Sequence, residues 1–260
     1  MSKRTAGMPA SLAITRQSVR TMRAELGSLI SLVAMPAILM MVFLPIAKDA
    51  LRQSGFRHAT GAEQVVPGMT VGFGLFLLGF VAFGFMSERQ WGTWDRLRAS
   101  QARPWEVVVG KLVPAFGLAV AYQLILFVLG AALFGLRVHG HAVALLLIVP
   151  TFGAAIVAIG IFLTSVAHTP QQVNVVSNIC GMGLSALGGA YVPVALLPAW
   201  ARAIAPVTPT YWAVRGFRVA FLPTYALSGA IASAAILAGL ALVFGVAAAS
   251  RLRAEVRRSR

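Results

Sequence analysis

Few side chains in this sequence could do chemistry, and their spacing argues against an enzyme. Glu88, Asp95 and Glu106 lie near apolar segments with arginines close by, so structural ion pairing explains them more simply than acid–base catalysis. The four histidines form no HExxH pair, and Cys180, the single cysteine, excludes an intrachain disulfide and a cysteine-based metal cluster. We therefore predict neither a catalytic site nor a metal site.

The elements that would position any site are apolar helices. Hydrophobic residues make up 58% of the chain and charged residues 11%, whereas a soluble domain has about 25% charged residues. A membrane-spanning helix needs about 20 mostly apolar residues. Six segments meet this requirement: residues 27–47, 65–86, 112–136, 142–166, 175–197 and 226–249. The sequence predicts an all-α integral membrane protein with six transmembrane helices in a single domain, residues 1–260.

The basic residues predict the orientation, because Lys and Arg concentrate on the cytoplasmic side of membrane proteins. Six spans place both termini on one side. That side holds three basic clusters: Lys3, Arg4, Arg16, Arg20 and Arg23; Arg89, Arg96, Arg98, Arg103 and Lys111; and Arg251, Arg253, Arg257, Arg258 and Arg260. We predict a multi-pass protein of the plasma membrane with both termini in the cytoplasm. We therefore attribute the net charge of +15 to the membrane topology and not to a nucleic-acid partner.

Ionisable side chains are missing from the middle of the predicted spans. Transporters coupled to protons or sodium normally carry such a group, and intramembrane enzymes need acids, bases or metal ligands at depth. Both classes are therefore disfavoured. No GxxxxGK[ST] motif occurs, since Gly110-Lys111 is followed by Leu112, and the segments between spans are too short for a soluble domain. We expect no fused ATPase domain, so any energy source must be a separate protein.

The segment after the second predicted span, Ser87–Ser100, is the most informative stretch. Thr93 can cap a short helix, along which Trp91, Trp94 and Leu97 repeat at helical spacing. Arginines line the rest of this helix. The pattern predicts an amphipathic helix on the cytoplasmic membrane surface. A purely topological role, with the tryptophans in the interfacial belt, stays open.

In this position, Glu-Arg-x-x-Gly-Thr-x-Asp-x-Leu closely resembles the permease subunits of type-2 ABC exporters, which serve drug and polysaccharide efflux. The common form in that family is Glu-Arg-Glu-x-Gly-Thr-x-Glu-x-Leu, followed by Thr/Ser-Pro. The matching residues are Glu88, Arg89, Gly92, Thr93, Asp95 and Leu97, with Asp95 in place of the usual Glu. Gln90 replaces the second acid, and Ser100 is separated from Pro104. The resemblance covers essentially the whole chain.

The resemblance implies that this segment is a coupling helix held in a cleft of a separate ATPase. Its contact residues would be Glu88, Arg89, Gly92, Thr93, Trp94, Asp95, Arg96 and Leu97. Residues 167–172 would make a smaller second contact. Two ATPase subunits would bind ATP and Mg²⁺, this chain would bind no cofactor, and a second permease copy or a paralogue would complete a dimeric complex surrounded by lipid.

By resemblance to the compact drug-efflux branch, we expect the cargo to be a hydrophobic or amphipathic small molecule, such as a drug, an antibiotic or a lipid-like compound. Multidrug efflux and antibiotic resistance would follow. Export of a lipid-linked polysaccharide is the alternative within the family. A non-transporting membrane scaffold is the alternative outside it.

Two further segments fit the resemblance. Arg16, Arg20 and Arg23 repeat at helical spacing, which predicts an interfacial N-terminal helix that contacts either the ATPase or anionic lipid. Between the fifth and sixth predicted spans, five prolines in residues 193–223 exclude one continuous helix. We expect short re-entrant or interfacial helices there, on the outer face.

Three sets of residues are candidates for a translocation path. Gln171, Asn174, Asn178, Gly181 and Ser185 predict one polar or small face along the fifth span, and Phe73, Phe76, Phe80 and Phe83 an aromatic stripe along the second. Tyr122 and Gln123 are the strongly polar residues within the third span. Each set could instead serve helix packing, within the chain or across a dimer, because both roles keep polar groups away from lipid.

Overall fold

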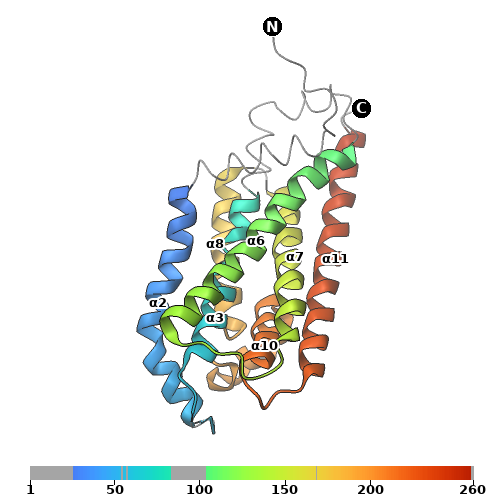
Figure 1. Cartoon of the computed structure of the whole chain (residues 1–260). Coiled ribbons are helices and arrows are strands. Elements are labelled where there is room, and N and C mark those ends of the chain that lie inside the picture. Colours follow the sequence, from blue (N-terminus) through green and yellow to red (C-terminus); the bar gives the residue numbers. More distant parts are fainter. Residues whose placement is uncertain (1–25, 54, 57, 83–103, 168, 259–260) are drawn as a thin grey trace.

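The computed structural model describes residues 26–53, 55–56, 58–82, 104–167 and 169–258, and these residues form helices and connecting turns without strands. The helices are α2 (Leu26–Gln53), α3 (Ala62–Gly74), α6 (Pro104–Phe134), α7 (Val143–Val166), α8 (Pro170–Leu187), η1 (Val194–Leu196), α9 (Ala199–Ile204), η2 (Ala205–Val207), α10 (Pro209–Phe221) and α11 (Leu227–Arg258). The long helices run side by side, and α10 lies at the end of the bundle where α2 ends and α3 begins (Figure 1).

Five segments of the described residues are long and apolar enough to cross a membrane: Ile30–Gln53, Ala62–Ala82, Leu112–Phe134, Val143–Val166 and Leu227–Arg251. Each overlaps a predicted span. The bounds predicted for the fifth span, 175–197, were wrong, because α8 ends at Leu187 and Gly189 turns the chain with φ 82°. Amide side chains lower the hydropathy of α8, and it is not among the five segments. A count of six therefore stays a prediction that requires α8 to cross the membrane.

The second span begins earlier than its apolar run predicts and is not one regular helix. Glu63 lies in the first turn of α3, where its Oε2 accepts hydrogen bonds from the backbone N–H groups of Thr60 (3.1 Å) and Gly61 (3.0 Å). These bonds keep a carboxylate satisfied although it is buried. The helix is interrupted at Leu75–Phe76 and resumes at residues 77–82.

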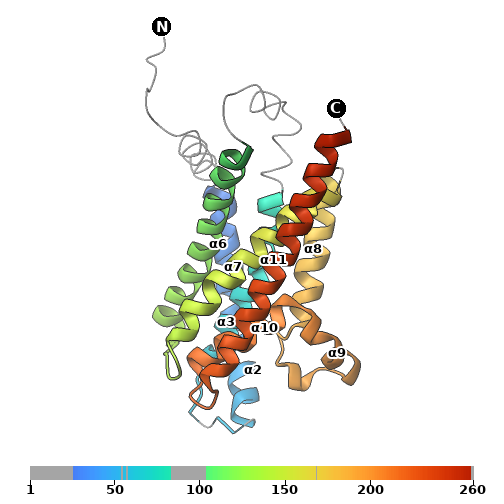
Figure 2. The ribbon, with the colours of Figure 1, turned by 90° about the vertical axis from the view of Figure 1, so that its right-hand side faces the viewer.

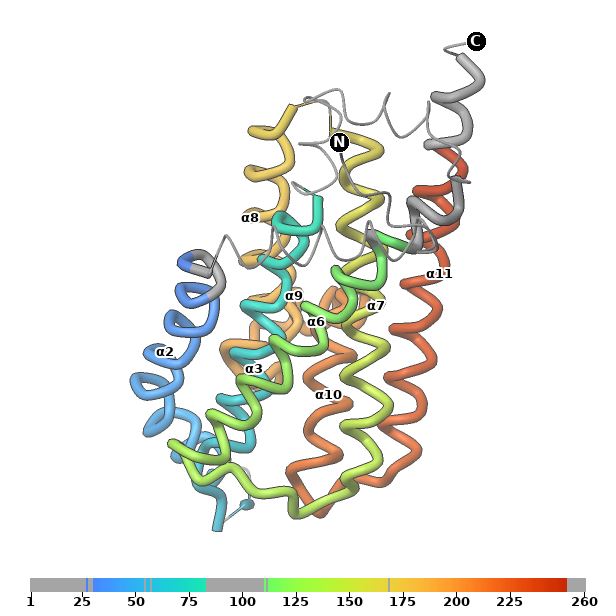
Figure 3. The backbone as a smooth tube through the Cα atoms, turned by 45° about the horizontal axis from the view of Figure 1, so that its top comes forward, coloured from blue at the N-terminus to red at the C-terminus, as the bar shows by residue number. Residues whose placement is uncertain are grey.

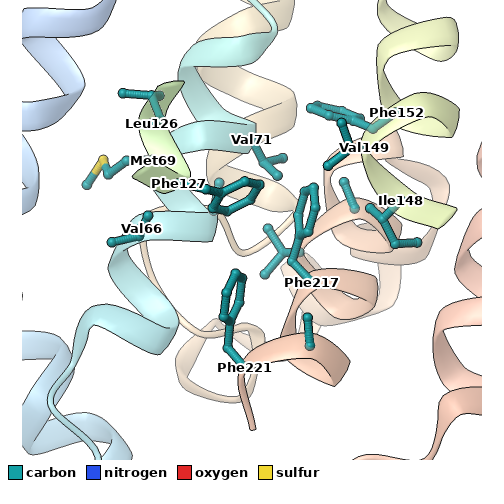
Figure 4. Packing of buried hydrophobic residues seen from close by; sticks show 14 of the residues in the cluster. Val66, Met69, Val71, Leu126, Phe127, Ile148, Val149, Phe152, Phe217 and Phe221 are labelled. Atoms are coloured by element: carbon teal, nitrogen blue, oxygen red, sulfur yellow. The ribbon is translucent and has the colours of Figure 1, made fainter. Parts of the chain in front are cut away.

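Helix α3 forms the centre of the bundle. In its span 78% of the most apolar stretch is buried, against 17–44% in the other four spans. On one side of it, the ring of Phe127 from α6 packs against Phe217 and Phe221 of α10, at centroid distances of 4.9 and 5.5 Å (Figure 4). The core therefore joins α10 to the spanning helices.

Helix α10 is too short to span a bilayer and returns into the end of the bundle, where it contacts α3, α7, α8 and α11 (Figure 3). Thr208 caps its start by accepting a hydrogen bond from the backbone N–H of Tyr211, and Pro209 occupies the first turn. At its other end, Gly140 N–H donates to the carbonyl of Ala220 and His141 N–H to that of Val219, both at 3.0 Å. The loop between α6 and α7 thereby satisfies two carbonyls that the helix leaves free.

Candidate functional site: the open face of helix α8

One face of α8 packs against the second span. Val173, Ser177, Gly181 and Ser185 are buried and follow one another at intervals of four residues. Ser185 Oγ donates a hydrogen bond to the carbonyl of Gly72 (3.1 Å), and the ring of Phe76 lies against Gly181. Small residues on both helices permit this close approach.

The opposite face of α8 carries exposed amides. Asn174 and Asn178 are exposed, and Asn178 Nδ2 donates a hydrogen bond to Asn174 Oδ1 at 2.5 Å. Val175, Ile179 and Met182 are exposed beside them. Away from their ends, the helices α2, α6 and α11 expose large side chains that are apolar. A face with paired amides is therefore unlike the lipid-facing surfaces of the same bundle.

This face is open because α8 has few neighbours. Among the described residues, its main contacts are with α3, α9 and α10. Helix α9 projects from the side of the bundle that carries α8 (Figure 2), and Leu196, Trp200 and Ile204 in and around it are exposed. The exposed side of α8 therefore continues into an exposed apolar surface towards the end of the bundle that holds α10.

The structure divides the polar face that the sequence predicts on this span. Gln171, Asn174 and Asn178 are exposed, whereas Gly181 and Ser185 are buried against the second span. Residues four apart on a helix form a row that is inclined to the helix axis. The second span packs along such a row, so its contact begins beside the predicted polar face and includes that face towards the end of α8. Asn174 and Asn178 lie on the open face, and Ser185 lies in the helix contact.

The aromatic stripe lies beside this contact. Phe76 and Phe80 are half-buried, and the ring centroid of Phe73 lies 5.5 Å from that of Phe76 and 6.5 Å from that of Tyr191. Because the helix is interrupted at Leu75–Phe76, the stripe is not the regular one that the spacing predicts. Phe83 lies outside the described residues.

Tyr122 and Gln123 lie elsewhere, in the packing of α6 against its neighbours. Both are buried, and Gln123 Nε2 donates to the carbonyls of Ala119 (3.0 Å) and Val149 (3.1 Å), which joins α6 to α7. Tyr122 packs near Gly74 of α3. The structure does not bring these two residues to the open face of α8.

Sequence reasoning missed a polar pair at the end of the bundle that holds α10. Arg218 Nε donates to Gln64 Oε1 at 2.9 Å, and Arg218 Nη2 donates to the same oxygen. Burial lowers the pKa of this guanidinium from its ordinary value, while the neighbouring Tyr225 opposes that change. The signal in the sequence is weak, because Gln64 precedes an apolar run and Arg218 lies in the proline-rich stretch of residues 193–223.

The predicted coupling helix, with Glu88, Arg89, Gly92, Thr93, Trp94, Asp95, Arg96 and Leu97, lies outside the described residues. The same is true of the N-terminal segment with Arg16, Arg20 and Arg23. Of the predicted second contact at residues 167–172, the structure describes all but residue 168. The side chain of Thr169 caps α8 by accepting a hydrogen bond from the backbone N–H of Gln172 (3.2 Å). The role of all three segments stays a prediction.

The bundle of apolar helices defines a multi-pass membrane protein. Residues 11–222 match the ABC-2 type transporter family, and the chain belongs to this family. It is a membrane component of ABC transporters, and the family implies an ATPase partner. The chain is also 26% identical over 122 residues to two Escherichia coli proteins described as "Probable multidrug ABC transporter permease YbhR". The match covers 47% of this chain and 33% of each relative.

Proposed function

We propose that this chain is the membrane-spanning subunit of an ATP-driven exporter that moves a hydrophobic or amphipathic small molecule out of the cytoplasm. Two separate ATPase subunits supply the energy through residues 88–97, and a second permease copy or a paralogue completes the complex. In this proposal α8 also crosses the membrane, as the fifth of six spans, the protein lies in the plasma membrane, and both termini are cytoplasmic. The family and the relatives named as multidrug permeases support the class of protein.

The observation that carries the proposal is the exposed pair of Asn174 and Asn178 on α8. An amide in hydrocarbon leaves polar groups without partners, which is costly. One hydrogen bond between the two side chains uses one of two donors on Asn178 and leaves both donors of Asn174 unused. Water in a path, cargo or a facing helix would satisfy the rest, so we assign the open face of α8 to the translocation path between two permease subunits.

The direct test is transport in membrane vesicles that hold the full chain and its ATPase partner. The double substitution Asn174→Leu with Asn178→Leu should lower ATP-dependent efflux of an amphipathic dye by roughly tenfold, because the path loses its polar lining. A matched control is Val243→Leu with Val246→Leu, two exposed positions on α11, which should leave efflux unchanged.

Copurification tests the ATPase part of the proposal separately. The chain should copurify with a soluble ATPase, and the complex should hydrolyse ATP. An active preparation that transports without any ATPase would refute the exporter assignment. Wild-type efflux from the double asparagine variant would instead refute only the role of α8.

A further inference from the structure

The guanidinium of Arg218 is held at a defined place by a neutral partner. Gln64, in the first turn of α3, is 2% exposed, and its Oε1 accepts from both Nε and Nη2 of Arg218. Gln64 Nε2 points to the carbonyl of Gly189 at 3.5 Å. The guanidinium is thus oriented between α3 and the last turn of α10.

No carboxylate within the described ranges neutralises the charge of this group. Among the residues that the structure describes, no acid forms a salt bridge with Arg218, and its side-chain partners are Gln64 and Tyr225. The nearest acid in sequence to Gln64 is Glu63, whose carboxylate accepts hydrogen bonds from Thr60 and Gly61 at the start of α3. The negative end of α10 offsets only part of a full charge. A partly buried cation without a counter-ion is costly and usually marks a binding function.

The same group has capacity left for a ligand. Arginine has five N–H donors. Its Nε and one N–H of Nη2 donate to Gln64, and Tyr225 lies beside the guanidinium. Further N–H groups of the guanidinium therefore remain for a ligand. Arg218 is half-buried and Tyr225 is 37% exposed, so the site is reachable. A planar fork of N–H groups matches the paired oxygens of a phosphate or carboxylate.

We propose that Arg218, oriented by Gln64, binds the phosphate or carboxylate group of an anionic amphiphile at the end of the bundle that holds α10. The apolar part of the amphiphile lies along the neighbouring helices, and its charged group neutralises the guanidinium. The inference requires only that the chain spans a membrane, which five apolar segments support. It does not rest on transport or on the ATPase.

The test measures binding to the purified full-length chain in a neutral maltoside detergent, without any ATPase. The probes are dioctanoyl phosphatidylglycerol and dodecyl phosphate, with zwitterionic dioctanoyl phosphatidylcholine for comparison. The wild-type chain should bind the two anionic probes roughly tenfold more tightly than the zwitterionic one, as expected for charge-assisted hydrogen bonds. Arg218→Gln should abolish that preference.

Gln64→Glu separates ligand binding from a merely structural tether. The new carboxylate keeps the contact to Arg218 and supplies its counter-ion, so the thermal unfolding temperature should stay at or above the wild-type value while the anion preference disappears. Arg215→Gln is the matched control: it removes one exposed charge from the same helix, where Arg215 lies over the ring of Trp212, and should keep the preference. An unchanged preference in Gln64→Glu and Arg218→Gln, or an equal loss in Arg215→Gln, would overturn the proposal.

Native mass spectrometry of the same samples distinguishes the two sources of such a group. A phospholipid that survives purification on the wild-type chain, and is lost from Gln64→Glu, identifies a resident lipid. A site that is empty after purification but binds dodecyl phosphate identifies a transient amphiphile. Both results support the site, whereas anion binding that does not depend on residues 64 and 218 contradicts it.

Discussion

Ser185 Oγ donates a hydrogen bond to the carbonyl oxygen of Gly72 at 3.1 Å, and this bond joins α8 to the central helix α3. Both residues are buried in a contact made by small side chains. Side-chain hydrogen bonds between membrane helices contribute only about 0.6 kcal/mol on average. The small size of Ser185 should therefore matter more to the contact than its hydroxyl group.

We expect Ser185→Ala to lower the free energy of unfolding by no more than about 1 kcal/mol, and Ser185→Leu to lower it by about 1–3 kcal/mol because the larger side chain overpacks the contact. Unfolding of the purified chain by a denaturing detergent, followed by circular dichroism, measures both. Ala186→Leu is the matched control, since Ala186 is exposed on the same helix. Equal losses from Ser185→Leu and Ala186→Leu would show that the contact is not tightly packed.

Hydrophobic runs were sufficient to locate the long helices. A bilayer offers no hydrogen-bond partners to the backbone, so a continuous apolar segment that crosses it must form a helix. Hydrophobic runs misplaced the bounds of α8, since Gln171, Asn174 and Asn178 make the first half of this helix polar. They also failed for Arg218 and Gln64, which are 154 positions apart. This pair depends on the return of α10 into the bundle, and no local sequence pattern predicts it.

Gly140 should be a sensitive position for the fold. Its N–H donates to Ala220, and a Cβ at this position would collide with the carbonyl of Val219 on α10. Because backbone atoms cannot move aside easily, Gly140→Ala should destabilise the chain by about 2 kcal/mol. Thermal unfolding monitored by fluorescence would detect this loss.

Gly117→Ala provides the control for Gly140→Ala. Gly117 lies within α6, and a Cβ there would meet nothing within 4 Å. Alanine favours a helix over glycine by about 1 kcal/mol, so this change should be neutral or stabilising. A loss of stability from Gly117→Ala as large as that from Gly140→Ala would contradict the contact between the α6–α7 loop and α10.

The predicted coupling helix can be tested although it lies outside the described residues. Glu88→Ala removes the first acid of the motif, and Gly92→Pro places a proline directly before the predicted helix start. Both should reduce ATP-dependent efflux by roughly tenfold or more if the segment transmits work from the ATPase. Membrane insertion, measured as the amount of chain in the membrane fraction, should be unchanged. Wild-type efflux from both variants would remove the coupling role.

The orientation of the chain can be tested with cysteines at two serines. Cys180 is replaced by serine first, because it is the single cysteine and would react as background. Ser54→Cys follows α2, at the end predicted to be external, and Ser259→Cys follows α11 near the C-terminus. An impermeant thiol reagent added outside intact cells should label the cysteine at position 54 and spare the one at 259, since the basic clusters predict that both termini are cytoplasmic. Labelling at 259 alone would invert the topology, and it would place Arg218 and its proposed anion site on the cytoplasmic side.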